Sequence, residues 1–76
     1  MTVQSEQLGA RIKSLRLKRY PTESARAFAR RAGVNYAHLS KIEGGKVMPT
    51  VPVLEKLAGG LGVELADLLA TTPGEQ

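Results

Sequence analysis

The fold is decided by residues 25–44, which read ARAFARRAGVNYAHLSKIEG. Ser24 can cap a helix with apolar residues at the i, i+3, i+4, i+7 spacing of one buried helical face, namely Ala25, Phe28, Ala29 and Ala32. Gly33 ends this helix, because glycine takes a left-handed conformation without strain. Asn35 can then cap a second helix that stops at Gly44. Two short helices joined by a turn that contains a glycine form the helix-turn-helix pattern.

The second of these helices has one face that can enter the major groove of DNA. Leu39 and Ile42 mark its buried side at 100° per residue. Tyr36 lies on the flank, and the exposed side carries Ala37, Ser40, Lys41 and Gly44. From Tyr36 to Glu43 the helix is about 12 Å long, which matches the major-groove width of about 12 Å.

Length and composition limit the classes of protein that fit. Seventy-six residues make one small domain, 1–76, with a thin core and an expected ordered part at about residues 5–70. The absence of cysteine excludes disulfides and thiolate metal sites. No apolar run approaches the length of a membrane span and no signal-peptide core is present, so we expect a cytoplasmic protein without membrane contact.

The positive charge lies almost entirely in the first part of the chain. Residues 1–46 hold ten Lys or Arg against three Glu, a net charge of +7, whereas residues 47–76 have a net charge of −3. A basic half that carries the helix-turn-helix pattern favours a polyanionic partner, and nucleic acid is the obvious one. A solvated basic surface without a partner is the alternative, and charge alone does not separate the two.

Three further helices are predicted around the central pair. The first begins near Ser5 and stops before Pro21, and its inward residues are Leu8, Ile12 and Leu15. Thr50 caps another, whose inward residues are Val53 or Leu54, Leu57, Ala58 and Leu61. Residues 71–76 form a polar tail after a short fifth helix that contains Val63, Leu65, Leu68 and Leu69. Without any strand pattern, the expected fold class is all-α.

The order of short motifs along the chain resembles a known family. The runs LGARIKSLRLKR and FARRAGVNYAHLSKIEGGKVMPTVPVLEKLAGGLGVELADLL are similar to the Cro/C1-type (XRE-type) helix-turn-helix domain over about residues 8–69. The specific part is the series AGV, LSKIE, G-K, P-T and L-A-x-x-L-G-V, followed by D-L-L. The resemblance implies a five-helix, lambda-repressor-like fold, sequence-specific binding to double-stranded DNA, commonly as a dimer, and transcriptional control.

The resemblance also implies two features at the junction of the helices. Arg16 lies beside the inward stripe of the first helix, and the family pattern implies an ion pair with Glu43; otherwise Arg16 must extend to solvent along its aliphatic stem. The family often has a glutamine at the first position of helix two, where it braces a DNA phosphate and the recognition helix. Ala25 occupies this position here. We expect Arg26 or the Ser24 hydroxyl to take over the contact.

Nine residues are candidates for DNA contact: Ser24, Arg26, Asn35, Tyr36, Ala37, His38, Ser40, Lys41 and Lys46. Lys41 can donate to guanine O6 and N7, or remain a solvated lysine. Tyr36 can meet a base edge or a sugar, or lie over the helix flank. Ala37 can touch a thymine methyl group, and Asn35 is a cap that can also hold a phosphate. His38 is expected to pack or to face a phosphate, because one histidine without cysteine makes no metal site.

The same inventory argues against an enzyme, because one histidine and scattered glutamates form no catalytic arrangement. No cofactor, metal or small-molecule ligand is expected. We predict a sequence-specific transcriptional regulator, nucleoid-associated when bound, in particular a repressor that binds a palindromic operator as a homodimer. The predicted dimer surface consists of Leu65, Leu68 and Leu69; the alternative is that these leucines only close a thin core. The alternative is an antitoxin or protein-interaction module with weak or lost DNA binding, which the replaced glutamine favours.

Overall fold

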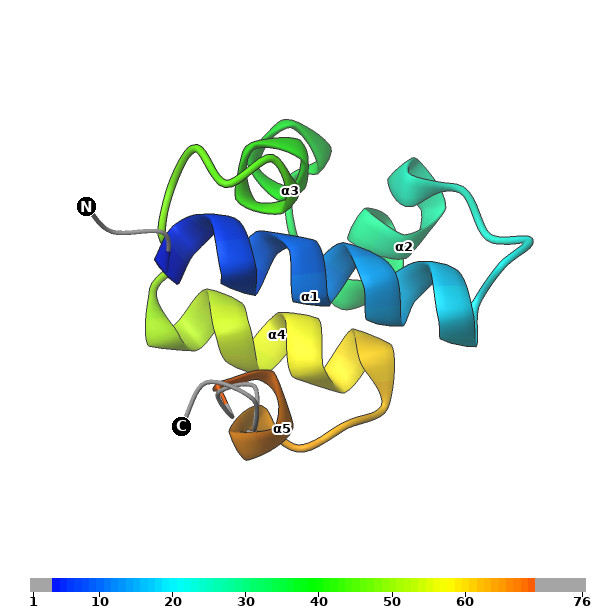
Figure 1. Cartoon of the computed structure of the whole chain (residues 1–76). Helices are drawn as coiled ribbons and strands as arrows, with labels where there is room; N and C mark the ends of the chain where they lie inside the picture. The colour runs from blue at the N-terminus through cyan, green and yellow to red at the C-terminus, as the bar shows by residue number, and fades with distance from the viewer. Residues whose placement is uncertain (1–3, 70–76) are drawn as a thin grey trace.

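The computed structural model of the chain describes residues 4–69 (Figure 1). Within these residues the chain forms five helices and no strand: α1 Gln4–Arg19, α2 Ala25–Ala32, α3 Tyr36–Glu43, α4 Val51–Leu61 and α5 Leu65–Leu69. The prediction of an all-α, five-helix fold is therefore confirmed. The polar tail predicted for residues 71–76 lies outside the described residues.

Side-chain caps begin three of the helices at the predicted residues. Ser24 accepts a hydrogen bond from the third N–H of α2 at 3.0 Å, and Thr50 accepts one from the third N–H of α4 at 3.4 Å. Asn35 accepts from the second and third N–H groups of α3 at 2.8 and 3.3 Å. Gly33 and Gly62 end α2 and α4 with φ angles of 82° and 74°, in the left-handed region that favours glycine. Local sequence therefore sets the bounds of these helices.

The helices are arranged so that α3 and α5 lie on opposite sides of the molecule (Figure 1). α1 crosses the view, with α2 and α3 above it, α4 below it, and α5 beneath α4. α1 packs against α3, α4 and α5, and α2 packs against both α3 and α4. The face of α3 that points away from the core is therefore left uncovered by the other helices.

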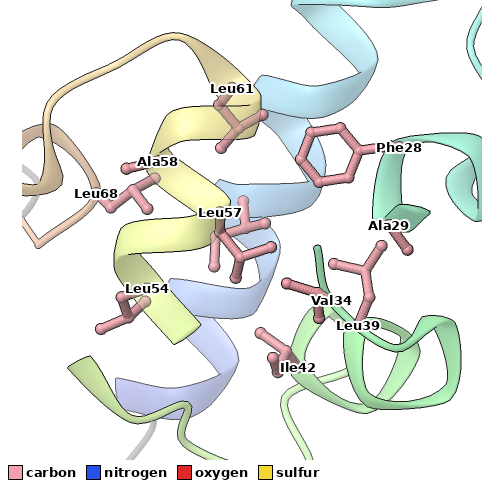
Figure 2. Close-up of a cluster of buried hydrophobic side chains, with 11 residues drawn as sticks. Phe28, Ala29, Val34, Leu39, Ile42, Leu54, Leu57, Ala58, Leu61 and Leu68 are labelled. Carbon is pink, nitrogen blue, oxygen red and sulfur yellow. The ribbon is translucent and has the colours of Figure 1, made fainter. Parts of the chain in front are cut away.

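Every helix contributes to one apolar core. Figure 2 shows Leu57 and Leu61 of α4 pointing toward the side where Phe28 of α2 lies. Of the two residues left open for the inward side of α4, Leu54 is buried and Val53 is half-buried. The largest side chains that the core encloses completely are Ile12, Phe28, Leu39, Ile42, Leu57, Leu61 and Leu68.

The prediction that Leu68 belongs to a dimer surface is wrong, because the monomer itself buries this side chain to 1% exposure. Figure 2 shows Leu68 beside Ala58 of α4, where it closes the core. A chain of this length has too thin a core to leave that leucine outside. Leu65 is half-buried against the same core, and Leu69 is 49% exposed. Of the three leucines, Leu69 has the surface for a further contact.

Candidate nucleic-acid interface

α3 presents a polar face on the surface of the molecule. Leu39 and Ile42 are buried in the core, whereas the Tyr36 side of the helix is open, with this residue 36% exposed. His38 is half-buried, and the exposed residues of the outward face are Ala37, Ser40 and Lys41. This division matches the one expected from the helical wheel.

The loop that follows α3 is held by hydrogen bonds and carries a second exposed lysine. The N–H of Lys46 donates to the carbonyl of Lys41 at 2.9 Å, and the N–H of Gly45 donates to the carbonyl of Ile42 at 3.0 Å. The hydroxyl of Ser5 in α1 donates to the Gly45 carbonyl at 3.1 Å. Neither lysine has an ion pair with any residue from 4 to 69. Two unpaired cations therefore lie at the C-terminal end of α3.

Another cation lies at the N-terminal end of α3. Arg26 is the second residue of α2, and its Cζ atom is 4.3 Å from the ring centroid of Tyr36, the first residue of α3. Ala25 is the first residue of α2, so the position of the family's glutamine holds only a methyl group. Ser24 accepts a hydrogen bond from the backbone of α2 as its cap. Of the two residues expected to replace the glutamine, Arg26 is the one in contact with α3.

An ion pair between Arg16 and Glu43 fixes α3 against α1. Arg16 Nε donates to Glu43 Oε2 at 2.7 Å and Nη2 donates to Oε1 at 3.0 Å, so the pair is bidentate. The two side chains are only 7% and 9% exposed. The hydrogen bond that Arg16 donates to Glu43 raises the pKa of Arg16, and burial opposes that rise. The ion pair implied by the family resemblance is present. The guanidinium of Arg16 therefore has a structural role, as the partner of Glu43.

A shallow hollow lies where α1, α2 and α3 meet, and it brings in a cation that the sequence reasoning missed. Lys13 of α1 and Lys46 both line this hollow, together with Tyr36 and Ser40 of α3. Lys13 is exposed and precedes Arg16 by three residues, which places both on one face of α1. The three-residue spacing between Lys13 and Arg16 was the signal that could have identified Lys13 as a residue of this surface.

A family model described as a helix-turn-helix domain matches residues 7–72, which is most of the chain. The chain belongs to the helix-turn-helix domain family. Its similarity to the Cro/C1-type (XRE-type) members is thereby confirmed as well. The chain is also similar to the crystal structure of the clp gene regulator ClgR from C. glutamicum, with a TM-score of 0.79 and 28% sequence identity. That match covers 90% of this chain and 85% of the ClgR chain. A comparison with curated proteins found no significant match.

The connector before the helix-turn-helix pair is closed by an ion pair that neutralises its acidic residue. Glu23 lies one residue before the cap of α2, and Arg31 of α2 donates to both of its carboxylate oxygens at 2.9 Å. These hydrogen bonds lower the pKa of Glu23 and raise the pKa of Arg31. The Arg31 guanidinium also stacks on the ring of Tyr20, with its Cζ 4.5 Å from the centroid. This ion pair between the connector and α2 was not predicted from the sequence.

The electrostatics at the ends of the helix-turn-helix pair favour an anion. Neither α2 nor α3 has an acidic residue in its first turn, so the positive ends of both helix dipoles are uncompensated there. Within residues 4–69, no group of three or more His, Asp or Glu side chains is placed to hold a metal ion. Over the same residues, no helix is long and apolar enough to cross a membrane.

Proposed function

We propose that the chain is a sequence-specific, double-stranded DNA-binding transcriptional regulator. One observation carries this proposal: the exposed face of α3 has unpaired cations at both ends. Arg26 lies at the N-terminal end and Lys41 and Lys46 lie at the C-terminal end, and the described part of the chain offers none of them a carboxylate. The major groove has a phosphate backbone on each side, so a helix bordered by cations in this way fits it. Membership in the helix-turn-helix family and similarity to a protein named as a gene regulator support the proposal.

The proposed contacts divide into two groups. Phosphate contacts set affinity and orientation, while contacts to base edges set the sequence preference. We assign the base contacts to the outward residues Ala37, Ser40 and Lys41. We assign the phosphate side to the residues at the ends of the pair, namely Ser24, Arg26, Asn35, His38 and Lys46. Lys41 in this scheme donates to guanine, and the methyl group of Ala37 packs on thymine.

The proposal extends to a homodimer that represses transcription from a palindromic operator in the cytoplasm. One recognition helix reads only a few base pairs, which is too little to select a site among the competing sequences of a genome. Two copies on half-sites about 34 Å apart solve this. Exposed apolar residues at the α4 and α5 side support a contact between copies: Met48, Val51 and Leu69 are 50%, 55% and 49% exposed. No catalytic step and no cofactor is part of the proposal.

Selection of sites from random duplex DNA at physiological salt tests the proposed function. The expected result is enrichment of a palindrome whose two half-sites are separated by one turn of the double helix. A single enriched half-site would retain sequence-specific binding but refute the dimer. If no sequence is enriched and every duplex binds with equal affinity, sequence-specific regulation is refuted.

A protein-interaction module, such as an antitoxin with weak DNA binding, is the second candidate. Ala25 favours it, because the family's bracing glutamine is absent from the first position of α2. The unpaired cations around α3 favour DNA. Absence of any retardation of duplex DNA at low salt by a folded, monodisperse chain would decide for the second candidate.

A further inference from the structure

We propose that Arg26 and Tyr36 form one functional unit, in which the tyrosine ring holds the guanidinium in position to bind a phosphate of the DNA backbone. The unit supplies a bracing contact for which Ala25 has no polar group. The inference rests on the proposed DNA binding. It makes Tyr36 a positioning residue and not a reader of bases.

The geometry joins the two helices of the motif directly. The Cζ of Arg26 lies 4.3 Å from the ring centroid of Tyr36, which is within the distance at which a guanidinium and an aromatic ring attract each other. Arg26 belongs to the first turn of α2 and Tyr36 to the first turn of α3. The stack therefore connects the starts of both helices.

A guanidinium stacked on a ring keeps its hydrogen-bond donors free. The five N–H groups of arginine lie in the plane of the guanidinium, and they match a phosphate in a bidentate arrangement. Arg26 is exposed, and it has no ion pair with the residues from 4 to 69. The ring limits the rotamers of Arg26, so less conformational entropy is lost when a phosphate binds.

Two other arginines near the motif, Arg16 and Arg31, do not combine these properties. Arg16 is buried and bonded to Glu43, and Arg31 donates two hydrogen bonds to Glu23. Their charges are neutralised by carboxylates. Arg26 is held by an aromatic ring in place of a carboxylate, so its orientation is restricted while its positive charge remains available to an anion.

The surroundings of the stack are also suited to an anion. The first N–H groups of a helix have no intrahelical acceptor, and they give its start a partial positive charge. The cap from Ser24 uses the N–H of Ala27. Ala25 and Tyr36 line the hollow that also contains Lys13 and Lys46. A phosphate at Arg26 would therefore lie at the edge of a basic hollow.

Binding measured over a range of salt concentrations tests the inference. The variants are Arg26→Ala, Tyr36→Ala, the double variant and Tyr36→Phe, each with a selected duplex and with a random duplex. Arg26→Ala should lower the affinity for both duplexes by about tenfold. It should also reduce the slope of log affinity against log salt concentration, the salt slope, by about one unit. Tyr36→Ala should lower the affinity for both duplexes equally, by about threefold. It should add no loss in the Arg26→Ala background, and Tyr36→Phe should bind like the parent because the ring is kept.

Arg30→Ala provides the matched control, because Arg30 is an exposed arginine of the same helix and its substitution removes the same charge. Its salt slope should stay nearer that of the parent than the slope of Arg26→Ala does. Additive losses in the double variant would overturn the inference. A change of preference at one base-pair position for Tyr36→Ala, with an unchanged salt slope, would also overturn it and assign Tyr36 to base reading.

Failure of the inference is distinguishable from failure of the proposed function. If the parent binds duplex DNA but the two single variants behave independently, only the unit is refuted. If the folded parent binds no duplex at any salt concentration, the proposed function is refuted and the unit with it. Upfield shifts of the Arg26 side-chain protons in the free protein, lost in Tyr36→Ala, report the stack itself without DNA.

Discussion

Gly60 of α4 packs directly against Ala32 of α2, and there is no room between them for another methyl group. A Cβ atom added to Gly60 would lie 2.8 Å from the Cβ of Ala32 and 3.2 Å from the ring of Phe28. The neighbouring Gly59 is exposed, and a Cβ there would meet no atom within 4 Å. Two adjacent glycines of one helix thus have opposite roles in packing.

Gly60→Ala should destabilise the fold, whereas Gly59→Ala should stabilise it. Overpacking of a core position costs about 1–3 kcal/mol, and α2 must shift because its own backbone carries the opposing methyl group. Alanine at an exposed helical position gains about 0.5–1 kcal/mol over glycine. Urea unfolding of the two variants measures both effects. Equal midpoints for the two variants would contradict the packing shown for Gly60.

Glu43→Ala should lower the stability of the fold strongly. It leaves the guanidinium of Arg16 buried without its partner, and breaking a buried pair from one side costs about 3–5 kcal/mol. For a domain of this size that loss corresponds to a fall in Tm of more than about 10 °C. Thermal unfolding followed by circular dichroism provides the measurement.

Two variants serve as controls for this ion pair. Replacing both partners, as Arg16→Met with Glu43→Leu, should recover a large part of the loss, because no unpaired buried charge remains. Glu23→Ala breaks the more exposed pair with Arg31 and should lower Tm much less. A Glu43→Ala variant that melts within one degree of the parent would refute the structural role of the pair.

The Glu23 carboxyl should titrate below the ordinary glutamate value of 4.5, because Arg31 bonds to its charged form. Because the pKa of Glu23 is lower in the folded than in the unfolded chain, its ionised carboxylate stabilises the fold at pH values above the unfolded-state pKa. This stabilisation is lost as the pH falls through the lower, folded-state pKa. Arg31→Gln should move the midpoint of Glu23, followed by NMR of its side-chain carbon, back toward 4.5. Arg30→Gln removes the same charge without this contact and should leave the midpoint closer to that of the parent.

Features encoded within a few residues of sequence could be predicted, whereas contacts between distant residues were harder to predict. The caps Ser24, Asn35 and Thr50 act on N–H groups two or three residues away, so sequence alone identified them. The apolar spacing likewise predicted that Leu39 and Ile42 are buried. These signals depend on helix geometry alone.

Apart from the Arg16–Glu43 pair, which the family resemblance implied, the sequence could not predict which side chains meet across helices. Leu68 was assigned to a surface because a short helix with several leucines does not show how much of it α4 covers. Arg31 entered the prediction only through the net charge of residues 1–46, although folding of the connector brings Glu23 to it. The contact of Arg26 with Tyr36 depends on the angle between α2 and α3, which no local pattern specifies.

Lys41→Ala and Lys46→Ala should affect DNA binding in different ways. Loss of a bidentate contact to a base removes about 1–3 kcal/mol of discrimination, so Lys41→Ala should relax the sequence preference. Lys46→Ala should lower the affinity for all duplexes alike and reduce the salt slope by about one unit. Lys56→Ala, on α4, is the charge-matched control and should change neither quantity. Equal loss of specific and non-specific affinity for Lys41→Ala would move that lysine to the phosphate contacts.

Leu69→Asp should abolish the proposed homodimer without unfolding the chain. Leu69 is 49% exposed in α5, so an aspartate there remains solvated in the monomer but would be desolvated in an interface. α5 does not pack against α3, so an interface at Leu69 would leave the exposed face of α3 free for DNA in each copy. Leu17→Asp is the matched control, because Leu17 of α1 is 47% exposed and lines a different surface with Lys13 and Lys18.

Sedimentation at tens of micromolar, with and without a palindromic duplex, measures this prediction. The parent and Leu17→Asp should sediment as dimers or bind the palindrome with two copies per duplex. Leu69→Asp should sediment as a monomer and lose affinity for the full palindrome more than for a single half-site, because only the two-copy complex needs the interface. A parent that is monomeric in both conditions, with one copy per duplex, would rule out the dimer. A dimer that persists in Leu69→Asp would place the interface on another surface.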